Sequence, residues 1–484
     1  MKICIVAEGS YPYITGGVSS WIHALITSMP QHEFILLTVG AEEKMKGKYK
    51  YTLPPNVSAV HESFLDVFLR EEDKWGKTFS LSADEYSAFK SLISGGADTN
   101  WDALFKLLLD KRWETSTEFL MSKDYFDLLS ELGREKYSQL PFREMFWTVR
   151  SMLLPLMQLL RQTIPEADLY HAVSTGYAGV LASFGKQLYG RPMLLTEHGI
   201  YSREREEEII KADWVKGYFK DIWIQFFYGL ASCAYLYSDK VITLFGRNLE
   251  MLIELGCPSE KASIIPNGVR TNDYMQLPQP EEGHFREKVI IGAIVRVVPI
   301  KDIKTMLLGF VHVKREVPNA ELIVMGPTEE DKQYYRECLE LVDLLGIEDV
   351  TFTGSVNIKE YLGRMDLMLL TSISEGQPLA ILEGLAAGKP FVSTDVGGCR
   401  ELLYGRNDSY GQAGYVVPVM NDEELAKAII RLCRNEQERI RMGLNGRNRV
   451  LNDYTHEQFI SKYEELYDEL GMSIGTKGER EWRA

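Results

Sequence analysis

The chain has 484 residues, of which 45% are apolar and 25% charged, so two or three globular domains with sizeable cores are expected. The 54 Lys and Arg residues are outnumbered by 69 Asp and Glu residues, and the resulting net charge of -15 argues against a nucleic-acid partner. The first apolar run is too short for a signal peptide, and no apolar stretch reaches the roughly 20 residues that span a bilayer. The composition therefore predicts a cytoplasmic protein with no transmembrane segment.

The six cysteines are far apart in the sequence and form no C-x-x-C pair. This spacing argues against both a disulfide framework and a cysteine zinc site. We expect buried, reduced thiols.

The first half of the chain alternates short apolar runs with loops and amphipathic helical segments. A run at the amino terminus is followed by a turn-rich loop and a helical pattern, which is the start of a parallel α/β unit. The rhythm predicts a doubly wound parallel sheet. Its expected strands are residues 3–7, 34–39, 169–172, 193–196 and 240–244.

Residues 62–150 interrupt this rhythm with helical spacing and an unusual number of aromatic side chains. Sixteen of these residues are aromatic, including four of the eight tryptophans. We predict a helical insertion whose aromatic residues fill its own core, and any exposed subset would form a partner surface. The aromatic residues singled out are Phe64, Phe68, Trp75, Trp101, Phe105, Trp113, Phe146 and Trp147.

A stretch rich in proline and glycine, residues 266–283, predicts the linker to a second α/β series. We expect an N-terminal domain over 1–278, completed by a C-terminal helix over 455–484, and a second domain over 279–454. The carboxyl ends of two such sheets are where ligands bind in this class of fold. The expected strands of the second domain are residues 289–295, 320–325, 350–352, 367–370 and 390–393.

The strongest local pattern follows the strand at 367–370. Glu375 lies at the carboxyl end of this strand, and the segment after Pro378 is helical, so Gly376, Gln377, Pro378 and Leu379 form a helix entry. Backbone N–H groups and the positive end of the helix dipole make such an entry an anion site suited to a diphosphate. Glu383 lies about one turn into the helix. The two carboxylates can therefore address separate hydroxyl groups, although both also suit a purely structural role.

Two cations follow the first strand of the second domain. Arg296 ends this strand and Lys301 lies in the next loop. Their charge would offset negative charge that develops on a leaving diphosphate. Strands commonly end in charged residues, so the pair is informative only together with the anion site.

The first domain contributes a glycine pair and two histidines. Gly16 and Gly17 follow the first strand, where a backbone can approach a ligand closely, although a tight turn explains them equally well. His198 follows the strand at 193–196, where a side chain is delivered to the edge of the sheet. For His171, at the end of an earlier strand, a structural role is the simpler interpretation.

Several patterns are missing from the sequence. It contains no G-x-G-x-x-G, P-loop, G-x-S-x-G or H-E-x-x-H pattern. No Asp-x-Asp pair occurs either, so a metal-bridged diphosphate lacks its usual ligands. We therefore expect neither a metal nor a separate cofactor, and the cations and the helix entry would neutralise the diphosphate.

Together these residues resemble the family 4 retaining glycosyltransferases. The resemblance rests on Thr15-Gly16-Gly17, His198-Gly199, Pro266-Asn267-Gly268-Val269, the pair of Arg296 and Lys301, and the E-x(7)-E spacing of Glu375 and Glu383. It implies the GT-B fold, an α/β architecture of two facing Rossmann-like domains, here with a helical insertion in the first. Two positions depart from relatives: Ile14 replaces a lysine and Val295 replaces a glycine.

The resemblance also implies roles for these residues. Arg296 and Lys301 would bind the donor diphosphate, and Gly16 and Gly17 would approach the phosphate or the acceptor. Glu375 would bind the hydroxyls of the transferred sugar and Glu383 the ribose. His198 would contact the sugar near the reacting carbon, and the backbone of Gly376, Gln377, Pro378 and Leu379 would surround phosphate and sugar.

The implied activity is a retaining, metal-independent transfer of a hexose or N-acetylhexosamine from a UDP-sugar to a growing exopolysaccharide. Docking on an inner-membrane exopolysaccharide synthase complex is compatible with the sequence but is not indicated by it. Two alternatives stay open: a catalytically idle sugar-nucleotide sensor or scaffold, and a sugar-nucleotide 2-epimerase of the same fold.

Overall fold

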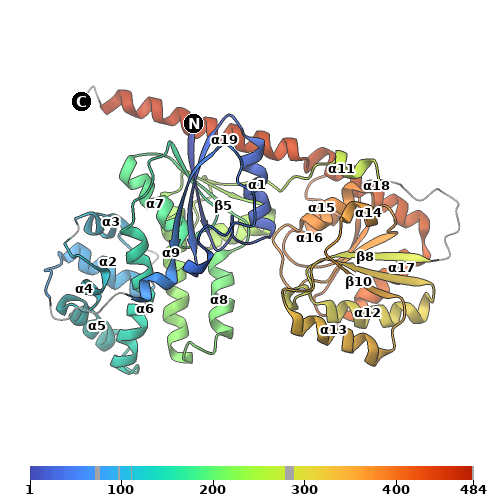
Figure 1. Cartoon of the computed structure of the whole chain (residues 1–484), viewed down its shortest axis with the longest axis horizontal. Helices are drawn as coiled ribbons and strands as arrows, with labels where there is room; N and C mark the ends of the chain where they lie inside the picture. Colours follow the sequence, from blue (N-terminus) through green and yellow to red (C-terminus); the bar gives the residue numbers. More distant parts are fainter. Residues whose placement is uncertain (71–76, 96–98, 111, 278–287, 482–484) are drawn as a thin grey trace. The chain divides into compact units, whose positions relative to one another are not determined.

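The computed structural model describes residues 1–70, 77–95, 99–110, 112–277 and 288–481. The contacts between residues divide the chain into two compact units (Figure 1). Unit 1 comprises Met1–Thr243, Leu249–Ser263 and Tyr463–Ala484, and unit 2 comprises Leu244–Asn248 and Ile264–Lys462. The sequence-based boundary at 278/279 lies among residues outside the described ranges. The contacts place 264–277 with unit 2 and begin the C-terminal contribution to unit 1 at Tyr463 rather than at 455.

Unit 1 is built on a seven-stranded sheet of order β3-β2-β1-β4-β5-β6-β7. The pairings that join β3 through β6 are parallel. Interior strands such as β1 are apolar along almost their whole length because both faces of a parallel sheet are covered. The strands are β1 (Lys2–Glu8), β2 (Glu33–Gly40), β3 (Val57–Phe64), β4 (Leu169–Ala172), β5 (Met193–Glu197), β6 (Lys240–Thr243) and β7 (Ala262–Ile264).

The helices of unit 1 cover this sheet and extend beyond it (Figure 1). Five expected strands are confirmed, whereas β3 and β7 were not predicted. The elements that follow and connect the strands are α1 (Gly17–Ser28), η1 (Glu43–Met45), α7 (Tyr177–Tyr189), α8 (Tyr201–Lys211), η3 (Gly217–Phe219), α9 (Lys220–Tyr237) and α10 (Gly246–Glu254).

The predicted insertion is helical but lies further along the chain than expected. Residues 62–64 belong to β3, and the helical segment continues to Leu160. Trp101, Phe105, Trp113 and Phe146 are buried as predicted, whereas Trp147 is 41% exposed. Phe64 is buried at the end of β3, Trp75 lies outside the described residues, and the side chain of Phe68 is likewise not described. The segment comprises η2 (Leu65–Arg70), α2 (Ala83–Ser94), α3 (Trp101–Leu109), α4 (Ser116–Leu120), α5 (Lys123–Glu135) and α6 (Phe142–Leu160).

Unit 2 is built on a six-stranded, wholly parallel sheet of order β10-β9-β8-β11-β12-β13. This is the order of a Rossmann sheet. Successive strands are added first on one side of the first strand and then on its other side, so the order reverses between the first and fourth strands, here β8 and β11. The five expected strands are confirmed and β13 is additional. The strands are β8 (Val289–Ile294), β9 (Ala320–Met325), β10 (Val350–Gly354), β11 (Leu367–Leu370), β12 (Phe391–Thr394) and β13 (Gly414–Val417).

Helices cover both faces of the second sheet, and several begin with a side-chain cap. Asp302 accepts a hydrogen bond from the Thr305 N–H at the start of α12, and Asn421 does the same for Glu424 at the start of α17. The helices are α11 (Asn272–Met275), η4 (Pro299–Lys301), α12 (Ile303–Glu316), α13 (Lys332–Leu345), α14 (Ile358–Leu362), α15 (Leu379–Ala386), α16 (Cys399–Tyr404), α17 (Asp422–Arg434) and α18 (Glu436–Asp453).

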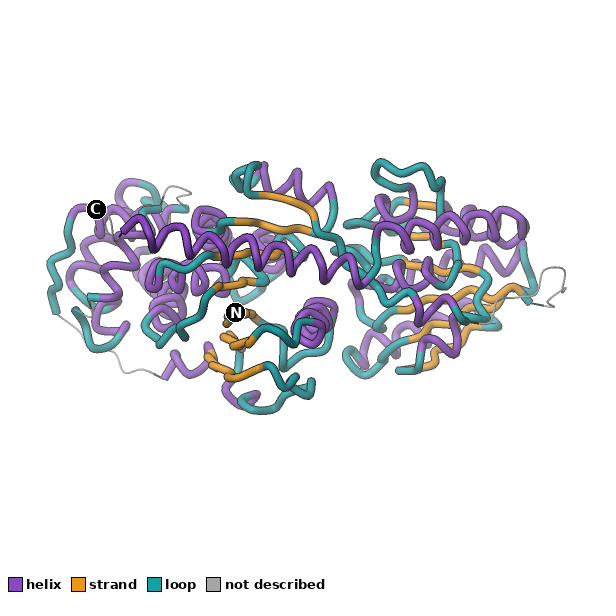
Figure 2. The backbone as a smooth tube through the Cα atoms, turned by 90° about the horizontal axis from the view of Figure 1, so that it is seen from above, coloured by secondary structure: helices purple, strands orange, loops and turns teal. Residues whose placement is uncertain are grey.

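From Tyr463 onward the last helix, α19 (His456–Glu481), belongs to unit 1, where it lies across the sheet (Figure 2). A hydrogen bond of 2.8 Å joins the hydroxyl of Tyr467 to Nδ1 of His171, and another of 2.8 Å joins His171 Nε2 to the hydroxyl of Thr196. Burial lowers the pKa of His171 to about 3, so this ring is neutral at neutral pH. His171 therefore has the structural role that the sequence favoured.

All six cysteines are buried and none is paired in a disulfide. In the described part of the chain, no helix is both long enough and apolar enough to cross a bilayer.

The Tyr467→Phe substitution should lower the free energy of unfolding by about 1–3 kcal/mol, because it leaves a buried histidine nitrogen without its partner. Urea unfolding measures this change. Tyr335→Phe, at a half-buried position of α13, is the control and should shift stability by no more than about 0.5 kcal/mol. Equal stability of Tyr467→Phe and the wild type would show that the Tyr467–His171 hydrogen bond does not help to hold α19 on the sheet.

Candidate active site

The two elements at the reversal point of the second sheet carry the central ion pair. Lys301 follows β8 and Glu375 follows β11, and β8 and β11 are neighbours. Lys301 Nζ donates to Glu375 Oε1 over 2.5 Å, and the two side chains are only 16% and 12% exposed. The hydroxyl of Ser372 donates to the same carboxylate oxygen over 2.5 Å. A cation and a carboxylate are therefore held together where an open α/β sheet binds its ligand.

Hydrogen bonds between the two loops fix the position of this pair. The hydroxyl of Thr371 donates to the carbonyl oxygens of Lys301 and Asp302 over 2.9 and 3.1 Å. The Ile373 N–H donates to the Ile300 carbonyl over 2.9 Å. Because backbone atoms join the loops, the pair does not depend on two freely moving side chains.

A second set of bonds fixes the entry of α15. The side chain of Gln377 is buried, its carbonyl oxygen accepts from the Asn267 N–H over 2.6 Å, and its amide donates to the Leu244 carbonyl over 3.3 Å. Asn267 donates in return to the backbone carbonyl of Gln377 over 3.2 Å. These bonds occupy both the side chain and the backbone carbonyl of Gln377.

The helix entry itself keeps the character expected of an anion site. Pro378 precedes α15, and no side chain caps the first turn, which begins at Leu379. The uncapped first turn therefore combines N–H donors with the positive end of the helix dipole, four residues after Glu375. Gly376 lies between these two features, and its carbonyl accepts from the Gly398 N–H over 2.8 Å.

Glu383 has a different partner, Tyr274. A hydrogen bond from the Tyr274 hydroxyl reaches the Glu383 carboxyl. Burial raises the pKa of Glu383 to about 7, and the Tyr274 bond and the charge of Lys359 oppose this rise. The sequence singled out Glu383 but gave no sign of Tyr274, which comes from the distant α11.

Arg296 is exposed and donates to Glu330 over 2.7 Å. The structure therefore brings Lys301 and Glu375 into direct contact but gives Arg296 a different partner. The predicted role of Arg296 on a diphosphate stays a prediction.

The predicted residues of unit 1 lie at the carboxyl ends of β1 and β5. Gly16 and Gly17 are exposed at the start of α1, and a Cβ atom at either position would meet nothing within 4 Å. The ring of His198 makes an edge-to-face contact with Trp21, with centroids 4.7 Å apart. Burial lowers the pKa of His198 to about 4, and its buried Nε2 has no hydrogen-bond partner within the described ranges. A neutral histidine with an available nitrogen can accept or donate one hydrogen bond to a ligand.

Unit 1 also contains a buried acidic cluster that sequence reasoning missed. Glu8, at the end of β1, accepts from the Tyr201 hydroxyl over 2.9 Å and lies 3.7 Å from Arg205. Glu197, at the end of β5, accepts from Tyr235 over 2.8 Å, and burial raises its pKa to about 7. A carboxylate that ends an apolar strand was the available signal for both residues.

No group of three or more His, Cys, Asp or Glu side chains placed to hold a metal ion occurs among the residues whose structure is described.

Comparisons with known proteins agree with this architecture. The family model described as "Glycosyl transferases group 1" matches residues 278–449, and the family model described as "Domain of unknown function (DUF3492)" matches residues 1–260. The structure of Anabaena HepE in complex with UDP superimposes with a TM-score of 0.61 at 16% identity, covering 97% of this chain and all of HepE. That likeness establishes the fold.

Two curated relatives are similar in sequence. The N-acetyl-alpha-D-glucosaminyl L-malate synthase of Bacillus anthracis is 33% identical over 236 residues, which is 48% of this chain and 59% of the relative. The MMP alpha-(1->4)-mannosyltransferase of Mycolicibacterium hassiacum is 25% identical over 289 residues, which is 58% of this chain and 66% of the relative. The chain thus spans less than two thirds of either relative.

Two Rossmann-like units, with the Lys301–Glu375 pair at the reversal point of the second, define a protein of GT-B fold. Its second unit carries a group 1 glycosyltransferase domain. The family model described as Domain of unknown function (DUF3492) matches more than half of the chain, so the chain belongs to this family.

The Gly397→Ala substitution should disturb the loop that holds Glu375. Gly397 has a φ of +49°, and a Cβ atom there would lie 2.2 Å from the carbonyl oxygens of both Glu375 and Gly376. We expect a loss of stability of about 2 kcal/mol or more, measured by thermal unfolding.

The matched control is Gly346→Ala, at a φ of +60° with nothing within 4 Å of the added atom. It has the backbone strain without the collision and should lose only about 1 kcal/mol. Equal losses in the two variants would show that the loop does not press against Gly397.

Glu383 should make stability depend on pH between its ordinary pKa of 4.5 and its folded pKa of about 7. Because folding raises this pKa, the protonated Glu383 contributes fully to the free energy of unfolding below pH 4.5. This contribution, about 3 kcal/mol at most, is lost as the pH rises through 7. Relative to the wild type, Glu383→Gln should therefore gain stability between pH 5 and pH 8 in urea unfolding.

Glu337→Gln provides the control, because the Lys304 hydrogen bond lowers the pKa of this exposed carboxyl below 4.5. Its stability difference from the wild type should stay constant between pH 5 and pH 8. The same constancy for Glu383→Gln would contradict the raised pKa.

Proposed function

We propose that this protein is a retaining glycosyltransferase that transfers a hexose or N-acetylhexosamine from a UDP-sugar to a growing exopolysaccharide. The observation that carries the proposal is the largely buried Lys301–Glu375 pair beside the uncapped start of α15. A cation and a helix entry suit a diphosphate, and a carboxylate four residues away suits the hydroxyls of the attached sugar. The group 1 glycosyltransferase domain spans all of these residues.

The donor is assigned to unit 2 in this proposal. Lys301, joined by Arg296, binds the diphosphate, Glu375 binds the sugar hydroxyls and Glu383 binds the ribose. The backbone from Gly376 to Leu379 surrounds phosphate and sugar. UDP as the nucleotide is supported by HepE, a protein of the same fold whose structure contains UDP.

The reaction we propose is a front-side displacement. The bond between the anomeric carbon and the diphosphate oxygen breaks, and a bond to the acceptor oxygen forms on the same face. The acceptor proton passes to the leaving diphosphate, so the protein supplies no separate base. Lys301 and the helix entry stabilise the negative charge that grows on the diphosphate, and no metal ion is required.

The acceptor is assigned to unit 1, where His198 would contact the sugar near the reacting carbon. The segments Glu8-Gly9-Ser10-Tyr11-Pro12-Tyr13 and Ser374-Glu375-Gly376-Gln377-Pro378-Leu379 resemble those of PelF, the cytosolic glycosyltransferase of Pel exopolysaccharide synthesis. The resemblance supports a Pel-type polymer as the acceptor, a cytosolic reaction and an inner-membrane synthase complex as the partner.

Lys301→Ala and Glu375→Ala should each lower turnover of the UDP-sugar by about 100-fold or more, as expected from removing one group that stabilises developing charge. Transfer of radiolabelled sugar to acceptor measures the loss. Lys304→Ala, which removes an exposed ion pair with Glu337 on the same unit, is the control and should keep wild-type turnover. Near-normal activity of both site variants, with folding intact, would refute these assignments.

The finer parts of the proposal have separate tests. Nuclear magnetic resonance of the product should show the anomeric configuration of the donor, and an inverted product would rule out a retaining mechanism. Calorimetric titration with UDP-sugars should give the same affinity with and without EDTA. Binding without turnover on any acceptor would favour a sensor or scaffold instead.

A further inference from the structure

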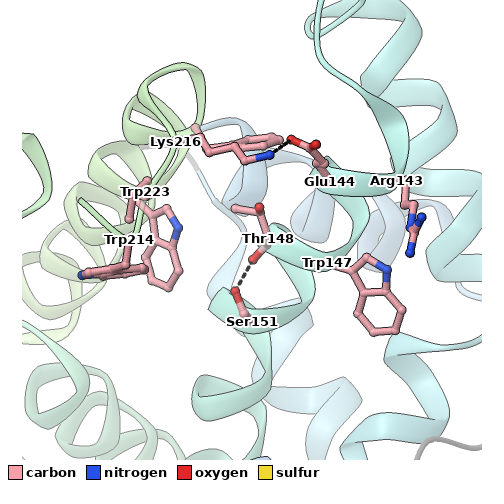
Figure 3. A pocket seen from close by; sticks show the side chains of 10 residues that line it. Arg143, Glu144, Trp147, Thr148, Ser151, Trp214, Lys216 and Trp223 are labelled. Atoms are coloured by element: carbon pink, nitrogen blue, oxygen red, sulfur yellow. Dashed lines mark hydrogen bonds and ion pairs between the residues drawn. The ribbon is translucent and has the colours of Figure 1, made fainter. Parts of the chain in front are cut away.

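An open pocket of about 500 Å3 lies in unit 1, and none of its lining residues belongs to the candidate active site (Figure 3). One side is formed by α6 and the other by the connection between α8 and α9 together with the first turn of α9. Three tryptophans, Trp147, Trp214 and Trp223, line it. This size and this aromatic lining are typical of a small-ligand site.

Two of the indole rings form a right-angled corner. The rings of Trp214 and Trp223 are inclined at 84° with centroids 5.4 Å apart, and Trp223 stacks on Phe227. The stacking fixes the orientation of Trp223. Trp214 is 69% exposed, which leaves a large apolar surface in water.

Besides the apolar Val215 and Phe219, the remaining lining contains the charged Arg143, Glu144 and Lys216 and two hydroxyl groups. Glu144 accepts from Lys216 over 2.8 Å and from the Tyr218 hydroxyl over 2.7 Å. These bonds lower the pKa of Glu144, so the carboxylate is ionised at neutral pH. Thr148 and Ser151 follow Glu144 along α6 and add hydroxyl groups on the same side of the pocket, where the Ser151 hydroxyl donates to the Thr148 backbone carbonyl over 2.7 Å (Figure 3).

This combination matches a pyranose ring. A sugar presents an apolar face of C–H groups, which packs on an indole, and a rim of hydroxyls, which bond to carboxylate, ammonium and hydroxyl groups. A membrane surface fits less well, because the chain carries a net charge of -15. Inserting the corner into lipid would also dehydrate the pair of Glu144 and Lys216.

The length of α8 indicates how long this saccharide would be. His198 lies just before α8, and Trp214 lies just after it. Eleven helical residues span about 16 Å, so an oligosaccharide rather than a single sugar reaches from one to the other. We propose that the pocket is a remote subsite for a saccharide unit of the acceptor chain. The identification of the saccharide as acceptor rests on the proposed function, whereas the pocket's affinity for sugar does not.

The test measures binding of defined oligosaccharides to the full chain by calorimetry. The probes are hexamers of N-acetylglucosamine and of glucose, and UDP is titrated into the same samples. Trp214→Ala should weaken binding of the preferred hexamer by about tenfold or more, the loss of one aromatic contact, and Trp214→Phe should restore most of it. Phe126→Ala, at another exposed aromatic residue of unit 1 that does not line the pocket, should bind as the wild type does.

The outcomes separate the subsite from the transferase. Failure of both hexamers to bind at millimolar concentration, or equal binding by Trp214→Ala and the wild type, would overturn the subsite even if UDP binds normally. Hexamer binding that depends on Trp214 without any UDP binding would support the sugar site and refute the transferase. Sedimentation with phosphatidylcholine or phosphatidylglycerol vesicles that depends on Trp214, without hexamer binding, would identify a membrane contact instead.

Discussion

The ammonium group of Lys301 and the carboxylate of Glu375 lie 2.5 Å apart with most water excluded. Two opposite charges in such surroundings attract strongly, but each has lost much of its hydration, so the pair is costly to hold unless the surrounding structure positions it. The Thr371 bonds to the backbone of the Lys301 loop and the Ser372 bond to Glu375 provide that positioning. A diphosphate that reached Lys301 would meet a cation already in place.

This pair depends on the order of the strands rather than on the two loops alone. In a sheet of order 3-2-1-4-5-6 the chain reverses between strands one and four, and the loops after these strands diverge and leave a crevice. Lys301 follows the first strand of the second sheet and Glu375 follows its fourth. The same order over the first six strands of unit 1 places Glu8 at the carboxyl end of the first strand, where burial raises the pKa of its carboxyl.

The helical segment between β3 and β4 gives unit 1 a surface that a bare Rossmann sheet lacks. Its core is packed with aromatic residues, such as the stacked Trp113 and Phe119. Its last helix, α6, also faces the connection between α8 and α9, and the exposed tryptophans of that pocket are outside the core. The aromatic residues of the segment therefore mainly fill its core, and Trp147 is the tryptophan that the segment contributes to the pocket.

Local pattern alone determined the α/β class, ten of the strands, the helical nature of the insertion and the residues at the ends of β8 and β11. These features are visible in sequence because apolar runs, turns and helix entries are properties of neighbouring residues. The strands β3, β7 and β13 were missed: β3 and β7 are only partly buried and show no long apolar run, and β13 begins with a glycine and has only three apolar residues before Pro418. Only the tertiary structure decided that Gln377 accepts a hydrogen bond from Asn267 and that Tyr274 donates one to Glu383. The same is true of the edge-to-face contact between Trp214 and Trp223. In the first two pairs about a hundred residues separate the partners, and Trp214 and Trp223 lie on opposite sides of η3 in the sequence. These contacts follow from packing and not from local preference.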